Sequence, residues 1–199
     1  QKMKAQNVPN WYVESCKRIS YLFPKAHAVA YVIMAFRIAY FKVHHPTEFY
    51  ASFFSLKTSA IDARYVTSRE QVEARMNDLQ EIMDRGEDKA RDQQEYSMLE
   101  VMKEAYLREV AIKPPRLTES DPSEFTMEDD TTIRAPYVTV EGMGETVAES
   151  IKTALDKREF SSIEDVKNRT GLNSNVEENA RDVGFFEELP DEDNYDLFD

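Results

Sequence analysis

Four polar side chains stand on or beside an apolar segment near the start of the sequence: Lys25, His27, Tyr31 and Arg37. The segment is almost wholly apolar from Ala26 to Phe41. Residues four apart lie on one side of a helix, so the rings of His27 and Tyr31 are placed to face a flat base together. The positive side chains suit phosphate groups. The alternative is a hydrogen-bonded core histidine beside an ordinary core tyrosine.

A second candidate site is the Gly-x-Gly sequence within "EGMGETVAESI", formed by Gly142, Met143 and Gly144. Glycines at such positions permit positive φ and leave backbone N–H groups bare. The helix expected to follow adds unpaired N–H groups and partial positive charge, which together form a phosphate cradle. With a helix on each side, this hairpin would grip a DNA backbone without reading base sequence, and Lys152 is a further predicted contact. The alternative is an ordinary glycine-rich loop before a helix.

The last residues form a third candidate, the sequence "NYDLF" at positions 194–198. Leu197 and Phe198 are an apolar pair on an acidic tail, and such a pair suits docking into a partner's pocket as an extended peptide. The alternative, in which the pair folds back onto its own domain, is equally open.

No metal site is expected in this sequence. His44 and His45 are adjacent, so on a helix they point about 100° apart, and no cysteine or acidic cluster stands near them. The sequence also shows no close acidic pair on an expected strand that would bind two metals for phosphoryl transfer. The phosphate-binding pattern G-x-x-x-x-G-K-[ST] is absent as well.

The charge is unevenly spread along the 199 residues, whose formal net charge is −13. Residues 1–50 hold seven Lys or Arg and two acidic residues, a net +5, which leaves −18 for the remainder. Such asymmetry is typical of a basic working surface attached to an acidic body. The single cysteine, Cys16, cannot form an internal disulfide and fits a reducing compartment. The chain begins with Gln, which suggests a piece of a longer protein.

The helix expected over residues 25–44 is apolar around its whole circumference, which predicts burial on all sides. Its apolar run is shorter than the roughly 20 residues that a bilayer span needs, and it contains Arg37. We therefore expect no membrane partner.

The other elements are mostly helical, with one small β-hairpin. Hydrophobic periodicity and proline positions predict helices over residues 10–21, 25–44, 47–57, 68–85 and 88–110, and one after Gly144. Two short strands around an acidic turn are expected within 125–140. Capping boxes predict three helix starts: Ser68 with Gln71, Ser161 with Glu164, and Ser174 with Glu177.

The order of these patterns resembles one protein family. The stretch "WYVESCKRISYLFPKAHAVAYVIMAFRIAYFKVHHP" is similar to the fingers region of C-family bacterial replicative polymerases, the alpha subunit of DNA polymerase III. The sequence Phe-Pro-Lys-Ala-His-Ala and the C-terminal residues resemble those of the PolC type. "EGMGETVAESI" falls where that family keeps its helix-hairpin-helix, and "NYDLF" where the PolC type carries its clamp-binding peptide. The resemblance spans essentially all 199 residues and is weakest in the acidic middle.

The resemblance implies three sets of contacts. The incoming nucleotide and nascent base pair would be contacted by Lys25, His27, Tyr31 and Arg37. The backbone of the product duplex would be contacted by Gly142, Met143, Gly144 and Lys152. The sliding clamp would be bound by Asn194, Tyr195, Asp196, Leu197 and Phe198. The clamp peptide of the family usually begins with Gln and Leu, where this chain has Asn and Tyr, and one further residue, Asp199, follows the Phe.

The implied parent activity is DNA-directed DNA polymerisation, in which a primer 3′-hydroxyl attacks a nucleoside triphosphate. The metal-binding aspartates of the family lie in its palm, outside these residues. The resemblance therefore implies that this chain binds no cofactor, that Mg²⁺ serves the palm, and that the chain alone is inactive. The implied partners are primer–template duplex DNA, dNTP, the sliding clamp and the remainder of the polymerase, in the cytoplasm of a bacterium.

The resemblance also suggests a division of the chain: the end of the fingers (1–57), a helical connector (58–115), a β-hairpin with the helix-hairpin-helix domain (116–190) and a clamp-binding tail (191–199). Two other functions stay open on the residues alone. One is a non-catalytic adaptor that binds DNA or tethers a sliding clamp. The other is a helical domain with a purely structural role and no ligand.

Overall fold

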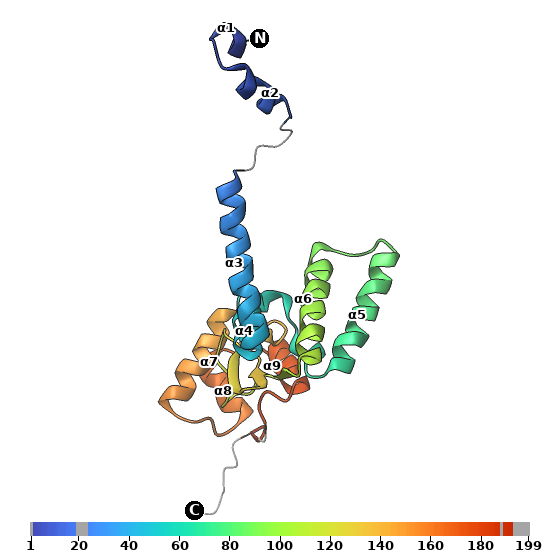
Figure 1. Ribbon diagram of the computed structural model, residues 1–199. Coiled ribbons are helices and arrows are strands. Elements are labelled where there is room, and N and C mark those ends of the chain that lie inside the picture. The colour runs from blue at the N-terminus through green and yellow to red at the C-terminus, as the bar shows by residue number, and fades with distance from the viewer. Residues whose placement is uncertain (1, 19–23, 188, 193–199) are drawn as a thin grey trace, which may run out of the picture. The chain divides into compact units, whose positions relative to one another are not determined.

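The computed structural model describes residues 2–18, 24–187 and 189–192 (Figure 1). The chain divides into two compact units, Gln1–Phe41 and Lys42–Asp199, which we call the N-terminal unit and the main unit. The domain boundaries expected from the sequence stay predictions, because this division concerns compactness alone.

The N-terminal unit is helical throughout its regular structure. It contains α1 (Lys2–Ala5), α2 (Asn10–Arg18) and most of α3 (Lys25–His44). The helix predicted over 10–21 is confirmed as far as Arg18, and its last residues lie outside the described ones. The predicted bounds of α3 are confirmed. The helix begins directly after Pro24, whose carbonyl accepts the first hydrogen bond, from the Ala28 N–H at 3.0 Å.

The burial predicted for α3 is wrong for the part of the chain that the structure describes. None of its 20 residues is buried, and large apolar side chains such as Phe36 (72% exposed) and Val43 (59%) face solvent. An apolar circumference indicates that a helix needs cover, but it does not identify what covers it. At 20 residues α3 is longer than the apolar run counted in the sequence, and its length and composition alone reach those of a membrane-crossing helix.

The main unit holds six further helices, three 3₁₀ turns and three strands among its described residues. In chain order they are α4 (Pro46–Ser55), η1 (Thr58–Ala60), η2 (Ala63–Tyr65), α5 (Arg69–Asp84), α6 (Ala90–Leu107), β1 (Ala111–Lys113), β2 (Thr126–Asp129), β3 (Thr132–Arg134), η3 (Tyr137–Thr139), α7 (Glu145–Lys157), α8 (Ile163–Thr170) and α9 (Ser174–Asp182). The mainly helical class predicted from the sequence is confirmed.

The three strands form one small sheet in the order β1-β3-β2. β2 and β3 are the predicted hairpin, antiparallel and with an irregular register between Met127 and Asp129. β1 pairs with β3 in parallel and was not predicted. The helix expected to reach residue 110 ends at Leu107 because Glu109 adopts a positive φ of 64°, and the Val110 N–H turns back to the Ala105 carbonyl at 3.0 Å.

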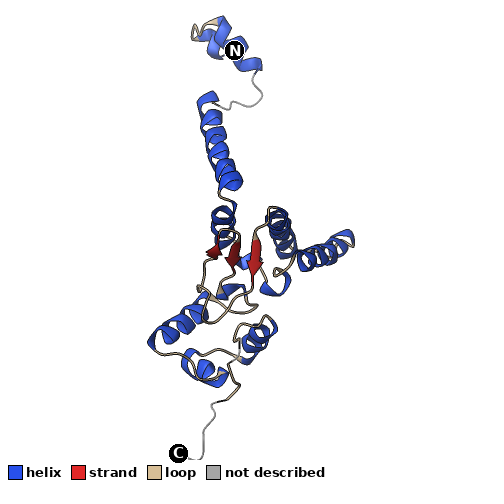
Figure 2. Cartoon of the chain, turned by 60° about the horizontal axis from the view of Figure 1, so that its bottom comes forward, coloured by secondary structure: helices blue, strands red, loops and turns tan. Residues whose placement is uncertain are grey.

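The sheet is covered by helices, as Figure 2 shows. α4 packs on β2 and β3, α6 contacts β1, and α5 and α6 pair with each other. Their inner faces enclose the first core, whose largest fully buried side chains include Tyr50, Phe54, Leu79, Met102, Ile112 and Ile133. The paired helices α5 and α6 face this core with residues at helical spacing, among them Val72 and Leu79 of α5 and Leu99 and Met102 of α6.

The second core belongs to the C-terminal part of the main unit. It lies among η3 and the helices α7, α8 and α9, and its buried side chains include Tyr137, Met143, Ile151, Val166, Val176 and Phe185. Val147, Ile151 and Leu155 recur every four residues along α7, and Ile151 is buried while the other two are partly buried. The helix predicted after Gly144 is thereby confirmed, and its apolar face is the one that packs.

Two of the three predicted helix starts lie one residue away from the observed caps. Ser68 caps α5 as predicted, since its hydroxyl accepts from the Gln71 N–H at 3.2 Å. The cap of α8 is Ser162, not Ser161, and it accepts from the Asp165 N–H at 3.0 Å. The cap of α9 is Asn173, not Ser174. Ser, Asn and Asp are all competent caps, so neighbouring candidates leave a capping pattern ambiguous by one position.

Candidate nucleic-acid interface

The Gly-x-Gly hairpin connects the 3₁₀ turn η3 to the start of α7. The full helix expected before the hairpin is this single turn, which follows Pro136 and ends where Val140 becomes extended. Thr139 reinforces the turn, because its hydroxyl donates to the Pro136 carbonyl at 2.6 Å. Because this first element is so short, contacts with more distant residues must hold the hairpin in position.

Gly142 is required by the fold, whatever it contacts outside the chain. Its φ is +83°, a conformation that side chains rarely tolerate, and a Cβ placed there would lie 3.2 Å from Val176 Cγ2. Met143, the middle residue, is only 3% exposed and its side chain lies in the second core. Its N–H already donates to the Val140 carbonyl at 3.0 Å. The two residues therefore shape the hairpin from within.

Gly144 differs from Gly142 in both respects. It has an ordinary extended backbone, with φ −77° and ψ 161°, and a Cβ added to it would meet no atom within 4 Å. Nothing in the described part of the chain requires a glycine here. An open glycine at the exposed N-cap of a helix instead lets an outside group approach the backbone closely.

Bare donors surround Gly144 at the start of α7. The backbone N–H groups of Gly144, Glu145 and Thr146 make no hydrogen bond among the described residues, as is usual for the first turn of a helix. They lie at the positive end of the helix dipole, where an anion is favoured. The predicted phosphate cradle therefore has the required donors, and Gly144 keeps them accessible.

The side chains near the cradle are mostly acidic. Glu145 and Glu149 project from the first turns of α7, and Glu141 precedes the hairpin. Lys152 lies about two turns along α7, where its ammonium pairs with Asp156 at 2.8 Å. Lys152 can thus reach a backbone phosphate only at a distance from the cradle, and any grip at Gly144 comes from N–H groups rather than from basic side chains.

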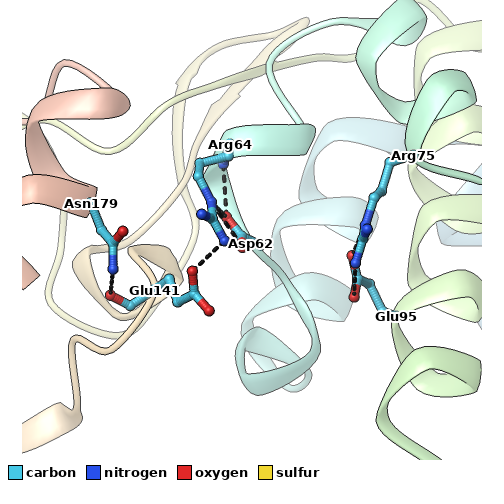
Figure 3. A network of polar contacts seen from close by, with 6 residues as sticks. All are labelled: Asp62, Arg64, Arg75, Glu95, Glu141 and Asn179. Carbon is cyan, nitrogen blue, oxygen red and sulfur yellow. Dashed lines mark hydrogen bonds and ion pairs between the residues drawn. The ribbon is translucent and has the colours of Figure 1, made fainter. Parts of the chain in front are cut away.

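Arg64 forms an ion pair with one of these carboxylates, that of Glu141. It lies in η2, and its Nη2 donates both to Glu141 and, at 2.6 Å, to Asp62 (Figure 3). The hydrogen bond to Asp62 is the main cause that raises the pKa of the Arg64 guanidinium above its ordinary value. From the other side, the Asn179 amide of α9 donates to the Glu141 carbonyl at 3.0 Å. The residue before the hairpin is therefore held by two distant segments.

These positioning residues were missed in the sequence. Arg64 lies 77 residues from Glu141, and Asn179 lies 38 residues beyond it. The only local signal was the spacing Asp62-x-Arg64, which suits a capped turn with a short-range ion pair. No periodicity joins such a turn to a hairpin so far along the chain.

The first predicted site lies on α3. Lys25, His27, Tyr31 and Arg37 are all exposed, and Tyr31 is 63% exposed. The rings of His27 and Tyr31 meet edge to face with centroids 4.5 Å apart, as the four-residue spacing predicted. Arg37 reaches back to the Met34 sulfur at 4.0 Å. Two aromatic rings and two cations are thus presented on one rod-like helix.

The third predicted site, Asn194 to Phe198, lies outside the described residues. For metals, the described part of the chain contains no group of three His, Cys, Asp or Glu side chains placed to hold an ion.

Comparison with known proteins supports a helix-hairpin-helix around the Gly-x-Gly sequence. A family model described as a helix-hairpin-helix motif matches residues 109–194, which include η3, the Gly-x-Gly hairpin and α7 to α9. The chain is 43% identical over 198 residues to DNA polymerase III PolC-type of Thermotoga petrophila and 42% identical to that of Thermotoga maritima, in each case over 99% of this chain. It is 38% identical over its whole length to the Streptococcus thermophilus protein. The chain is therefore similar to PolC-type DNA polymerase III over essentially its whole length.

The chain spans about 14% of the length of these PolC-type relatives. The match nevertheless runs through both candidate sites, since it extends from α3 to the hairpin and beyond. The family resemblance expected from the sequence, including its helix-hairpin-helix, is thereby confirmed.

Proposed function

We propose that this chain is part of a replicative DNA polymerase and grips the backbone of the primer–template duplex through the hairpin at Gly144. The proposal rests above all on one observation, the open glycine at the start of α7 within a matched helix-hairpin-helix. It is supported by the 38–43% identity to PolC-type polymerases over essentially the whole chain.

The chemistry of this grip is a set of hydrogen bonds from backbone N–H groups to phosphate oxygens. The donors of Gly144, Glu145 and Thr146 and the dipole of α7 stabilise the anion without a basic side chain. Phosphate contacts of this kind carry no base information, so the hairpin holds the duplex in register whatever its sequence. This suits a polymerase, which must hold every product it makes.

The second part of the proposal concerns α3, which we assign to the fingers. Lys25 and Arg37 would balance the charge of an incoming dNTP, while His27 and Tyr31 pack against the nascent base pair. The exposure of all four side chains and the edge-to-face contact of the two rings support this assignment.

The parent reaction is attack of the primer 3′-hydroxyl on the triphosphate, which depends on positioning and charge stabilisation. Mg²⁺ would supply Lewis acidity in the palm of the parent polymerase, and we place no metal ligand in this chain. We therefore expect the 199 residues alone not to extend a primer. We further propose that Asn194 to Phe198 bind the sliding clamp, and that the parent acts in the bacterial cytoplasm without a membrane partner.

The hairpin is tested by substituting Gly144 with Val. Because its φ is ordinary and its surroundings are open, the chain should still fold, with a loss of about 1 kcal/mol for placing Val at an N-cap that Gly suits better. Blocking hydrogen bonds to a charged group should nonetheless weaken binding of a labelled DNA duplex about tenfold or more, equally for unrelated sequences. Fluorescence anisotropy measures the affinity, and a salt series should give a falling log–log slope.

The matched control is Ala90→Val, which adds a branched side chain to the exposed first turn of α6 and changes no charge. Its duplex affinity should equal that of the wild type. A Gly144→Val protein that binds DNA as tightly as the Ala90→Val control would contradict the proposed grip. Gly142 is unsuitable for this test, because a side chain there strains the fold itself.

A further inference from the structure

We propose that Arg64 is a positioning residue for the duplex grip: held by Asp62, it fixes and neutralises Glu141 so that the cradle at Gly144 accepts a phosphate. This inference rests on the proposed function of the hairpin. It concerns a residue far from the hairpin in sequence and outside the matched helix-hairpin-helix region, which begins at residue 109.

The direction of the Arg64 side chain is fixed by Asp62. The Asp62 carboxylate accepts from Arg64 Nε at 3.1 and 3.2 Å and from Nη2 at 2.6 Å. The same carboxylate caps the turn η2 by accepting the Arg64 backbone N–H at 3.0 Å. A guanidinium held in this forked manner has little freedom, and its remaining Nη2 donor capacity is aimed at Glu141 (Figure 3).

Glu141 is held at two points. Its carboxylate accepts from Arg64, and its carbonyl accepts from the Asn179 amide at 3.0 Å. Gly142 follows it immediately and Gly144 lies three residues on, so fixing Glu141 fixes the entry to the hairpin. The element before the hairpin is only a 3₁₀ turn, and these two contacts supply the anchoring that a longer helix would otherwise provide.

The charge of Glu141 matters as much as its position. A bare carboxylate beside the cradle would repel the phosphate that the N–H groups bind. Arg64 balances that charge within an ion pair, yet its side chain is only 31% exposed and is shared with Asp62. Its role is therefore exerted through Glu141 rather than through direct contact with DNA.

Arg75 provides a matched control within the same unit. Its guanidinium donates to Glu95 from Nε at 2.7 Å and from Nη2 at 3.1 Å, and it stacks over the Tyr65 ring at 4.7 Å (Figure 3). Substituting Arg75 or Arg64 with Gln removes the same single positive charge. Only the Arg64 substitution releases a carboxylate next to the hairpin.

The test is a double-mutant cycle on the 199-residue chain with a fluorescein-labelled DNA duplex at fixed low salt. Arg64→Gln should weaken binding roughly five- to tenfold, while Arg75→Gln should leave the affinity within about twofold of wild type. Glu141→Gln should bind more tightly than wild type. The pair Arg64→Gln with Glu141→Gln should bind more tightly than Arg64→Gln alone, because the repelling carboxylate is gone, and any loss that remains measures the anchoring that Arg64 supplied.

Other outcomes overturn the inference. If Gly144→Val loses binding while Arg64→Gln binds like Arg75→Gln, or if the double variant binds no better than Arg64→Gln, Arg64 does not act through the charge of Glu141. Hydrogen exchange over residues 141–148 gives a second readout that does not need DNA. Arg64→Gln should accelerate exchange in that segment and Arg75→Gln should not, and equal effects would contradict the positioning role.

The proposed function can fail separately. If Gly144→Val and Arg64→Gln both bind duplex like the wild type while exchange still rises in the Arg64 variant, the anchoring stands and the DNA grip falls. If Gly144→Val loses binding and Arg64→Gln does not, the grip stands and the role of Arg64 is wrong.

Discussion

α3 and α7 both carry predicted nucleic-acid contacts, and both are rich in apolar residues, yet they differ in what surrounds them. On α7 the apolar residues form one stripe, so Ala148, Ile151 and Ala154 are buried and the opposite face is polar. On α3 the apolar residues run all round, and none is buried. A stripe encodes the direction of its partner, whereas an apolar circumference encodes only that cover is needed.

The two candidate sites also differ in the contacts that hold their residues in place. The hairpin at the start of α7 is fixed by buried packing and by hydrogen bonds from η2 and α9. The polar residues of α3 are fixed relative to one another by the helix, as the His27–Tyr31 contact illustrates. The chain therefore contains one site assembled from distant segments and one presented on a single helix.

The largest expected effect contrasts two phenylalanines. Phe54 of α4 is fully buried in the first core, and Phe36 of α3 is 72% exposed. Phe54→Ala should lower the free energy of unfolding of the main unit by about 3–5 kcal/mol, because it removes buried area and leaves a cavity. Phe36→Ala should change it by no more than about 0.5 kcal/mol.

Urea denaturation followed by circular dichroism measures both variants. A loss for Phe36→Ala comparable to that for Phe54→Ala would mean that α3 packs against the rest of the chain in solution. The comparison between the two helices would then be wrong.

A smaller effect tests the starts of the helices in the main unit. Ser162 caps α8 and is fully buried, while its neighbour Ser161 is exposed. Ser162→Ala should cost about 1 kcal/mol, the usual value of a lost N-cap, and Ser161→Ala should cost almost nothing. Thermal melts of the two variants distinguish the observed cap from the one that the sequence pattern favoured, since that pattern predicts the opposite order.

The sequence predicts what depends on neighbouring residues. The Ser68 cap, the helix after Gly144 and the hairpin between β2 and β3 each depend on residues close together in the sequence, and each is confirmed. Where two serines compete for the cap of α8, distant contacts contribute, because the Ile163 N–H donates to the Pro190 carbonyl at 2.9 Å. No local pattern contains that information.

The same limit applies to β1 and to Arg64. β1 has three residues and gains its hydrogen bonds from β3, about twenty residues later, so its own sequence carries too little signal. The glycines of the candidate site were identified from the sequence, but their different roles were not. Only the backbone angle and the space around each one separate Gly142, which the fold requires, from Gly144, which it does not.

The smallest expected effect is on stability in acid, which should differ between α3 and the helix α9. α3 contains no Asp or Glu, whereas Glu177 of α9 accepts hydrogen bonds from Lys167 and Arg181. The Lys167 contact, followed by that of Arg181, lowers the pKa of Glu177 below its ordinary value of 4.5. Since the folded pKa is the lower one, the stabilisation is present above pH 4.5 and is lost as the pH falls through the folded pKa.

Glu177→Gln should therefore destabilise the main unit at pH 7 by less than about 1 kcal/mol, as expected for partly exposed ion pairs. The difference from wild type should stay constant down to about pH 5 and then shrink in more acidic solution. Glu178→Gln, one residue along, is the control, because Glu178 is exposed and makes no ion pair within the described ranges. If the two variants lose stability in parallel at every pH, the contacts of Glu177 do not stabilise α9, and its packing on the second core alone holds the helix in place.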